Sequence, residues 1–296
     1  MPELPEVETI RRGLLSLIVG KTIARASNYQ SPKSFPNALS DVEMFLIGAK
    51  VTAIRRRAKM VLVDLSSGYT LVCHLKMTGQ IIVVQDGGRW GAGHPNDSFI
   101  HELPDRSTRE CIDFTDGTRL FFNDQRKFGW IKLCPTSEVP NIDFVRKLGP
   151  EPLEDSFTGQ VLYERLQRRK NTSIKAALLD QTVLAGVGNI YADESLWMVR
   201  VHPATQVKNV SPEQINALAS AVKSVMNLSI EKGGSTDKNY VNAEGKKGSY
   251  LSFSNVFRRE GQPCPRCGTA IIKIRVASRG THVCPNCQKI DKQALV

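Results

Sequence analysis

The sequence predicts an α+β protein of several domains: an antiparallel β-sandwich with an N-terminal helix, a helical domain, and a small C-terminal hairpin that carries four cysteines. Three observations predict this fold class. Apolar residues with helical spacing follow the N-terminus, short β-type runs extend to about residue 134, and helical periodicity returns from residue 156. We therefore expect domains over residues 1–134, 156–255 and 256–296, with an interdomain linker over 135–155.

Residues 6–18 are expected to form the N-terminal helix. Val7, Ile10 and Leu14 share one face at helical spacing, and Pro5 precedes them where a helix tolerates proline. Gly20 is expected to end the helix.

The predicted sandwich consists of short runs rich in β-branched and aromatic residues, separated by turn residues. Residues 86–108 are rich in Gly, Pro, Asn, Asp and Ser and are expected to form a surface loop. Hairpin turns are predicted at Ser67-Gly68 and Asp116-Gly117 because these pairs tolerate positive φ. The strands are predicted over residues 61–65, 70–75, 80–84, 111–114 and 119–122.

The second half begins with a proline-rich stretch that ends in Leu148-Gly149-Pro150-Glu151-Pro152, and proline restricts its neighbour's backbone as well as its own. Residues 156–232 then show helical periodicity. Residues 233–255 are polar and glycine-rich, which predicts a mobile loop.

Four of the seven cysteines form two pairs, Cys264-x-x-Cys267 and Cys284-x-x-Cys287, separated by sixteen residues. This spacing is typical of one structural zinc ion held by four thiolates. Two disulfides or a redox pair are the alternatives. The isolated Cys73, Cys111 and Cys134 are expected to be buried thiols without a chemical role.

The net charge of +11 favours a polyanionic partner, because each phosphate that a protein neutralises releases condensed counterions. An anionic membrane surface and plain solubility are alternative explanations. Lys and Arg outnumber acids most strongly over residues 257–296, a pattern that fits nucleic-acid binding, although zinc ribbons also bind proteins. No apolar run has the length of a membrane span, and the acidic N-terminus is unlike a signal peptide, so we expect a soluble cytoplasmic protein.

The N-terminus offers a nucleophile. Removal of Met1 would leave Pro2 with a secondary amine, and an α-amino group has a pKa of about 7.7–8.0. Such an amine condenses with a sugar aldehyde as a Schiff base, and Glu3 and Glu6 are placed to transfer protons beside it. A helix-capping role for the same residues is the simpler interpretation, and the two are compatible.

Four motifs in register resemble the bacterial formamidopyrimidine-DNA glycosylases, and the similarity extends over nearly the whole chain. These motifs are the opening Met1-Pro2-Glu3-Leu4-Pro5-Glu6-Val7-Glu8-Thr9, the Gly149-Pro150-Glu151-Pro152 stretch, Gly186-Val187-Gly188-Asn189-Ile190-Tyr191, and the four-cysteine tail. The resemblance implies a helix–two-turn–helix in the helical domain, a zinc finger at the end, and a monomer bound to damaged double-stranded DNA in the bacterial cytoplasm and nucleoid.

The resemblance also implies the catalytic residues. Pro2 would attack C1′ of the damaged nucleotide and drive β- and δ-elimination, and Glu3 would transfer protons during opening of the sugar. Glu6 would support the flipped nucleotide, and Lys59 would contact its phosphate. From the residues alone, the basic stretch Arg55-Arg56-Arg57-Ala58-Lys59 is more typical of a solvated surface than of a site.

The DNA-binding residues implied by the resemblance lie in several loops. Met77 and Phe128 would wedge between base steps, and Arg126 would contact the orphan cytosine. From the sequence alone, Met77 and Phe128 are also typical of core side chains. Asn189, at a helix start, and Arg279, in the zinc hairpin, would bind phosphates. Lys238 lies in loop 233–252, which would close over the extruded base.

Two stretches depart from the family pattern: Arg106-Ser107-Thr108-Arg109 stands where the family has a histidine-containing run, and Asn255-Val256-Phe257-Arg258 precedes the hairpin. The function we expect is a bifunctional glycosylase and abasic-site lyase that excises 8-oxoguanine and formamidopyrimidines. The rivals are an endonuclease VIII-like glycosylase for oxidised pyrimidines and a non-catalytic zinc-finger protein that senses DNA damage.

Overall fold

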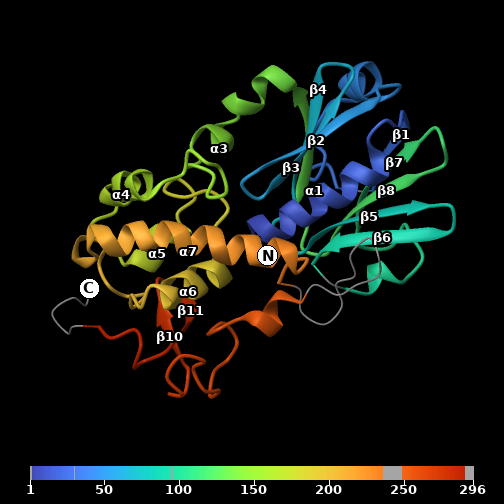
Figure 1. Ribbon diagram of the computed structural model, residues 1–296. Helices are drawn as coiled ribbons and strands as arrows, with labels where there is room; N and C mark the ends of the chain where they lie inside the picture. The colour runs from blue at the N-terminus through green and yellow to red at the C-terminus, as the bar shows by residue number, and fades with distance from the viewer. Residues whose placement is uncertain (1, 30, 95, 236–248, 291–296) are drawn as a thin grey trace. The chain divides into compact units, whose positions relative to one another are not determined.

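The computed structural model describes residues 2–29, 31–94, 96–235 and 249–290 (Figure 1). The chain divides into two compact units. The first contains Met1–Arg146 together with Lys232–Ser249, and the second contains Lys147–Glu231 together with Tyr250–Val296.

The first unit is a sandwich of two antiparallel sheets, as the sequence predicted. The four-stranded sheet has the order β2-β3-β4-β9, and the five-stranded sheet has the order β1-β7-β8-β5-β6. Helix α1 contacts β2 and β3 of one sheet and β6 of the other. The elements of this unit are α1 Leu4–Ile18, β1 Ile23–Asn28, α2 Leu39–Asp41, β2 Val51–Arg57, β3 Met60–Leu65, β4 Tyr69–His74, β5 Gly79–Gln85, β6 Gly88–Gly93, β7 Thr108–Phe114, β8 Arg119–Asp124, β9 Trp130–Pro135 and α3 Asp143–Arg146.

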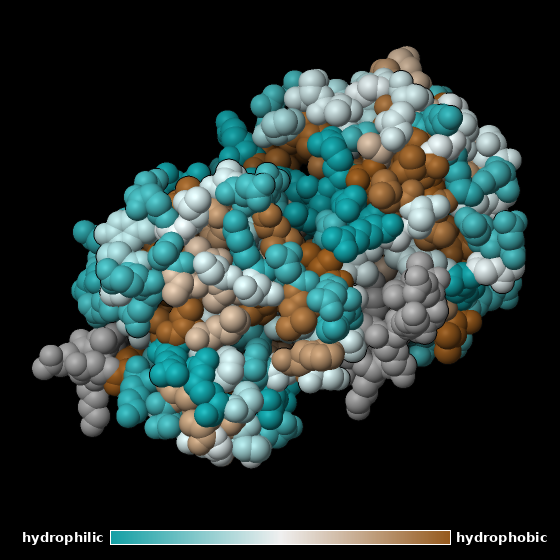
Figure 2. Space-filling model, viewed as in Figure 1, coloured by the Kyte–Doolittle hydropathy of each residue, from teal (hydrophilic) through white to brown (hydrophobic). Residues whose placement is uncertain are grey.

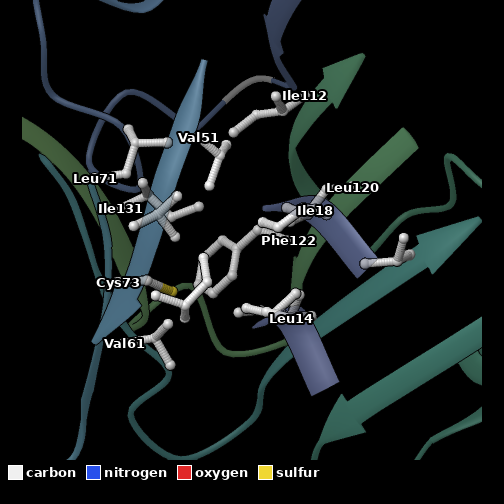
Figure 3. Packing of buried hydrophobic residues seen from close by; sticks show 14 of the residues in the cluster. Leu14, Ile18, Val51, Val61, Leu71, Cys73, Ile112, Leu120, Phe122 and Ile131 are labelled. Atoms are coloured by element: carbon white, nitrogen blue, oxygen red, sulfur yellow. The ribbon is translucent and has the colours of Figure 1, made fainter. Parts of the chain in front are cut away.

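The core of the first unit joins the two sheets and α1. Figure 3 shows the Phe122 ring extending from β8 towards Cys73 of β4, with Leu14 of α1 beside it. The apolar face predicted for the N-terminal helix is the buried face, because Val7, Ile10 and Leu14 are fully buried. Gly20, Gly68 and Gly117 have positive φ, which confirms the predicted helix stop and both hairpin turns.

The expectation of a loop over residues 86–108 was wrong in part, because β6 lies within it. This strand pairs with β5, and Trp90 and Ala92 enter the core. Gly91 leaves room for the ring of Phe99, which a Cβ atom at this position would overlap. Glycines that made the segment look like a loop therefore allow close packing at the edge of the sheet.

The second unit combines a helical domain with a two-stranded hairpin. Helix α7 packs against α4 and α6, and α6 also contacts β11 of the hairpin. The hairpin and the positive φ of Gly268 after the first cysteine pair agree with the sequence prediction. The elements of this unit are α4 Gly159–Gln167, α5 Ile174–Leu179, α6 Asn189–Met198, α7 Pro212–Glu231, β10 Ile272–Val276 and β11 Arg279–Val283.

Figure 2 shows hydrophilic side chains over much of the visible face, with apolar atoms in separate patches between them. Within the described ranges, no helix combines the length and the apolar character that a membrane crossing requires.

Candidate functional site

The start of α1 brings three predicted site residues together. Glu3 is the N-cap residue and forms a capping box with Glu6, in which the Glu3 N–H donates to Glu6 Oε2 at 2.9 Å. The capping role expected from the sequence is therefore present. Pro2 and Glu3 are both buried. The Pro2 nitrogen is an amide nitrogen as long as Met1 precedes it, so it becomes a free amine only after Met1 is removed.

Glu6 also holds a segment that is distant in sequence. Its Oε1 accepts hydrogen bonds from the Ser235 backbone N–H at 2.8 Å and from the Ser235 hydroxyl at 2.7 Å. Gly234, with φ +94°, lies so close that a Cβ atom would be 3.4 Å from Glu6 Cγ. Sequence reasoning missed Ser235, because a serine in a polar, glycine-rich stretch carries no distinguishing signal.

Lys59 lies in the two-residue turn between β2 and β3 and is buried. It follows Ala58, whose φ of 50° is left-handed. The preceding Arg56 pairs with Glu8 at 3.3 Å and donates to the Ala58 carbonyl at 3.1 Å. The turn is therefore packed into the unit, and the alternative of a solvated basic surface does not hold at Lys59.

His74, at the end of β4, pairs in register with Met60 of β3. Burial lowers the pKa of His74 to about 3, and the positive charges of Lys76 and Lys59 add to this effect. The ring is therefore neutral at physiological pH and lies in a cationic environment. The sequence analysis assigned His74 no role, because a single histidine at the end of a predicted strand carries no distinguishing signal.

Met77 and Phe128 are surface residues, with exposed fractions of 42% and 54%. The alternative that they belong to the core was therefore wrong. The Arg126 guanidinium lies 4.9 Å from the centre of the Phe128 ring. The loop between β4 and β5 thus exposes Met77 to solvent, and the loop between β8 and β9 exposes Phe128. Arg126 stacks on the Phe128 ring.

In the second unit, the structure brings Asn189 and the Arg279 turn together. Asn189 is the first residue of α6, as expected, and its side-chain amide donates to the Gly280 carbonyl at 3.0 Å. Arg279 is exposed at the start of β11. Gly186, with φ +81°, forms the turn that precedes α6. An exposed cation thus stands beside a helix N-terminus, an arrangement that suits a phosphate.

A buried ion pair holds α6 and the hairpin strand β11 together. Lys175 of α5 and Asp193 of α6 are both fully buried, with Lys175 Nζ 2.6 Å from Asp193 Oδ1. Lys175 also donates to the Thr281 hydroxyl at 2.7 Å, and Asp193 accepts from the His282 N–H at 2.9 Å. This network was not foreseen, because its members carry no local pattern.

The four cysteines of the hairpin converge. Their Sγ atoms all lie within 4.8 Å of one another, with 3.5 Å between Cys267 and Cys284 and 3.9 Å between Cys264 and Cys287. One tetrahedral set of four sulfur ligands fits zinc and leaves no open coordination position, so the site is structural. Cys73, Cys111 and Cys134 are free and buried, as expected. Lys238 lies outside the described residues.

Three protein families match successive parts of the chain. The formamidopyrimidine-DNA glycosylase N-terminal domain matches residues 1–131, the H2TH domain of the same enzymes matches residues 148–240, and the zinc finger found in FPG and IleRS matches residues 261–290. The last match and the four converging thiols together identify one structural zinc ion.

Proteins similar to this chain over nearly its whole length belong to the same family. Formamidopyrimidine-DNA glycosylase of Chloroflexus aurantiacus is 41% identical over 288 residues, covering 97% of this chain and 98% of its own. The enzyme of Pediococcus pentosaceus is 41% identical over 295 residues, covering 97% and 99%. Among solved structures, Lactococcus lactis Fpg in complex with DNA containing an abasic site has a TM-score of 0.85 at 32% identity and covers 97% of this chain and 100% of its own. A mutant of that protein bound to Fapy-dG-containing DNA gives the same TM-score and identity.

Proposed function

The chain belongs to the formamidopyrimidine-DNA glycosylase family, and on that premise we propose how this base-excision DNA glycosylase acts: it removes 8-oxoguanine and formamidopyrimidines from double-stranded DNA and then cleaves the abasic strand. The observation that carries the proposal is the capping box that fixes Glu3 and Glu6 at the start of α1, directly after Pro2.

The nucleophile is the secondary amine of Pro2 after Met1 has been removed. Its nitrogen attacks C1′ of the damaged nucleotide, the glycosidic bond breaks, and the base leaves. Glu3 donates a proton to the sugar oxygen as the ring opens, which leaves a Schiff base between Pro2 and C1′. Loss of a C2′ proton then eliminates the 3′ phosphate, and a second elimination releases the 5′ phosphate.

The remaining site residues hold the substrate. Lys59 neutralises the phosphate of the damaged nucleotide, and Glu6 supports the extruded nucleotide. A base within a duplex must leave the stack before its sugar is accessible, so Met77, Phe128 and Arg126 occupy the gap. The exposed positions of these three side chains support this role.

Residues of the second half bind the backbone. Asn189 and Arg279 contact phosphates, and Lys238 contributes from loop 233–252. In this scheme residues 1–134 form the catalytic domain, 135–155 the linker, 156–255 the helix–two-turn–helix domain and 256–296 the zinc finger. The protein acts as a monomer on the DNA of the cytoplasmic nucleoid.

Borohydride trapping tests the proposal. With duplex DNA that carries 8-oxoguanine opposite cytosine, the wild-type chain should form a reduced covalent conjugate whose linkage mass spectrometry locates at Pro2. Pro2→Gly and a chain that retains Met1 should form none, whereas Pro32→Gly, at an exposed proline of the same unit, should react normally. A conjugate on an internal lysine would overturn the mechanism.

Two further comparisons complete this test. Glu3→Gln should bind the lesion duplex and lose excision, and normal excision by this variant would remove Glu3 from its assigned role. Faster excision from a duplex with thymine glycol than from one with 8-oxoguanine would reassign the substrate to oxidised pyrimidines.

A further inference from the structure

Asp124, the last residue of β8, is fully buried and bonds to two loops. Its Oδ2 accepts from the Gly129 N–H at 2.6 Å, and its Oδ1 accepts from the Arg126 N–H at 3.2 Å. Both donors belong to the loop that presents Arg126 and Phe128. The same Oδ1 accepts from the hydroxyl of Thr78, which belongs to the other loop. One carboxylate therefore joins the segments on either side of the exposed apolar side chains.

Thr78 also bonds directly to the loop that contains Arg126. Its hydroxyl oxygen also accepts from the Arg126 N–H at 3.2 Å, and the residue is 8% exposed although its neighbour Met77 is 42% exposed. The Met77 loop and the Phe128 loop are thus bonded to each other directly beneath their exposed side chains.

The backbone of both loops is strained at the same relative position. Lys76, directly before Met77, has a φ of 51°, and Lys127, directly before Phe128, has a φ of 58°. A non-glycine residue in this region is strained and persists only where its surroundings enforce the conformation. At Gly129 a Cβ atom would lie 2.7 Å from Phe122 Cζ and 3.1 Å from Asp124 Oδ2, so the close approach of the loop to Asp124 requires glycine at this position.

Arg109 supports Asp124 from β7. It is 6% exposed, and its Nε donates to the Asp124 carbonyl at 2.8 Å, while the Asp124 N–H donates to the Ser107 carbonyl at 2.8 Å. The stretch that departs from the family pattern therefore fixes the main chain of Asp124.

From this geometry we propose that Asp124 is a positioning residue: through the Thr78 hydroxyl it holds the Met77 and Phe128 loops in one fixed arrangement, so that they enter the DNA as a single preformed wedge. The proposal rests on the proposed function of these loops as gap fillers. Ordering side chains on binding costs conformational entropy, and fixing both loops beforehand avoids this cost at the step that opens the duplex.

The test uses two substrates that differ only in whether a gap must be filled. One is a duplex with 8-oxoguanine opposite cytosine. The other is single-stranded DNA with an abasic site, whose sugar is already exposed and needs no wedge. The test variant is Thr78→Val, which keeps the shape and removes the hydroxyl, and Thr78→Ser restores the hydroxyl. Thr70→Val is the matched control, because Thr70 is a buried hydroxyl that bonds to Asp64 at 2.8 Å in the other sheet.

We expect Thr78→Val to excise 8-oxoguanine at least about tenfold more slowly in single turnovers, which corresponds to about 1.4 kcal/mol, and to be trapped on the single-stranded abasic site within about twofold of wild type. Asp124→Asn should show the same split, because it places an amide donor against the N–H groups of the loop. Thr78→Ser and Thr70→Val should resemble wild type on both substrates.

Two results would overturn the inference. One is equal excision by Thr78→Val and Thr78→Ser. The other is an equal loss by Thr78→Val on both substrates, which would mark a general role in folding. Failure of the wild-type chain to be trapped on either substrate would instead refute the proposed function.

Discussion

Ser235 is bonded twice to one oxygen of Glu6, through its backbone N–H and its hydroxyl. The other oxygen of Glu6 holds the backbone of Glu3. One carboxylate thus fixes both the start of α1 and a segment that is 229 residues away in sequence. We therefore expect a substitution at Glu6 to disturb both the start of α1 and the segment around Ser235.

Glu6→Ala is expected to weaken catalysis more than binding. Loss of the capping box costs about 1 kcal/mol of helix stability, and it releases Glu3, which must stay aligned with Pro2. Single-turnover excision should fall by roughly tenfold or more while the affinity for lesion duplex changes little. Ser235→Ala removes one of the two bonds to Oε1 and should have a smaller effect. Equal effects of the two substitutions would contradict the coupling through Glu6.

The ion pair between Lys175 and Asp193 predicts a large loss of stability on truncation. Lys175→Met would leave the Asp193 carboxylate buried without its cation, which typically costs about 3–5 kcal/mol. The double variant Lys175→Met/Asp193→Leu should recover part of this loss because no uncompensated charge remains. Lys223→Met is a matched control, since Lys223 is a more accessible lysine of the same unit that donates to the Glu154 carbonyl at 3.0 Å. Thermal unfolding of wild type and the three variants would measure these losses of stability. Similar losses for Lys175→Met and Lys223→Met would contradict the prediction.

The parts of this protein that the sequence predicts are those with a local signal. The spacing of Val7, Ile10 and Leu14 predicts α1, and the spacing of the cysteine pairs predicts the zinc site, because helix geometry and metal coordination constrain nearby residues directly. The strand β6 escaped prediction because its glycines suit a loop equally well. Only its packing on Phe99 and on the core distinguishes it.

The connections that position the site lack such a signal. Thr78 is 46 residues from Asp124, and Lys175 is 18 residues from Asp193. Each partner alone is an ordinary polar residue. The resemblance to a family directed attention to Met77, Arg126 and Phe128, but the residues beneath them emerge only when the chain is folded.

Glu110 predicts a pH dependence of stability. It is 1% exposed, on β7 opposite Asn28 of β1, and burial raises its pKa from 4.5 to about 8, with the Asn28 side chain opposing the rise in part. Between about pH 4.5 and 8 the folded chain therefore holds a proton that the unfolded chain has lost. The free energy of unfolding should decrease as pH rises through this range, by at most about 1.4 kcal/mol per pH unit, and the loss should level off above pH 8.

Glu110→Gln isolates this effect, because glutamine cannot ionise. Denaturant titrations of both proteins between about pH 5 and 9 should give a stability difference that shifts in favour of Glu110→Gln as pH rises, while contributions from other groups cancel. A difference that is independent of pH would show that Glu110 is not protonated in the fold.

Zinc removal should be visible at Trp197. Its indole N–H donates to Cys264 Sγ at 3.4 Å, and the Arg266 guanidinium lies 4.0 Å from its ring. Because the hairpin depends on metal coordination, a strong chelator should loosen these contacts and change the tryptophan emission, and duplex binding should be lost with it. Trp197→Phe should abolish most of the emission change without preventing zinc loss. An unchanged spectrum after one equivalent of zinc has been released would contradict the prediction.

Arg279 predicts a specific change in salt dependence. If about six phosphates are neutralised, wild-type affinity for duplex DNA should fall roughly a thousandfold between about 50 and 200 mM salt. Arg279→Ala removes an exposed cation beside the N-terminus of α6, so it should weaken binding to all sequences alike and reduce the slope of log K against log salt by about 1. Arg146→Ala is the control, because Arg146 is an exposed arginine already paired with Asp143 at 2.8 Å. An unchanged slope for Arg279→Ala would mean that this turn, although Asn189 holds it against α6, does not meet the DNA backbone.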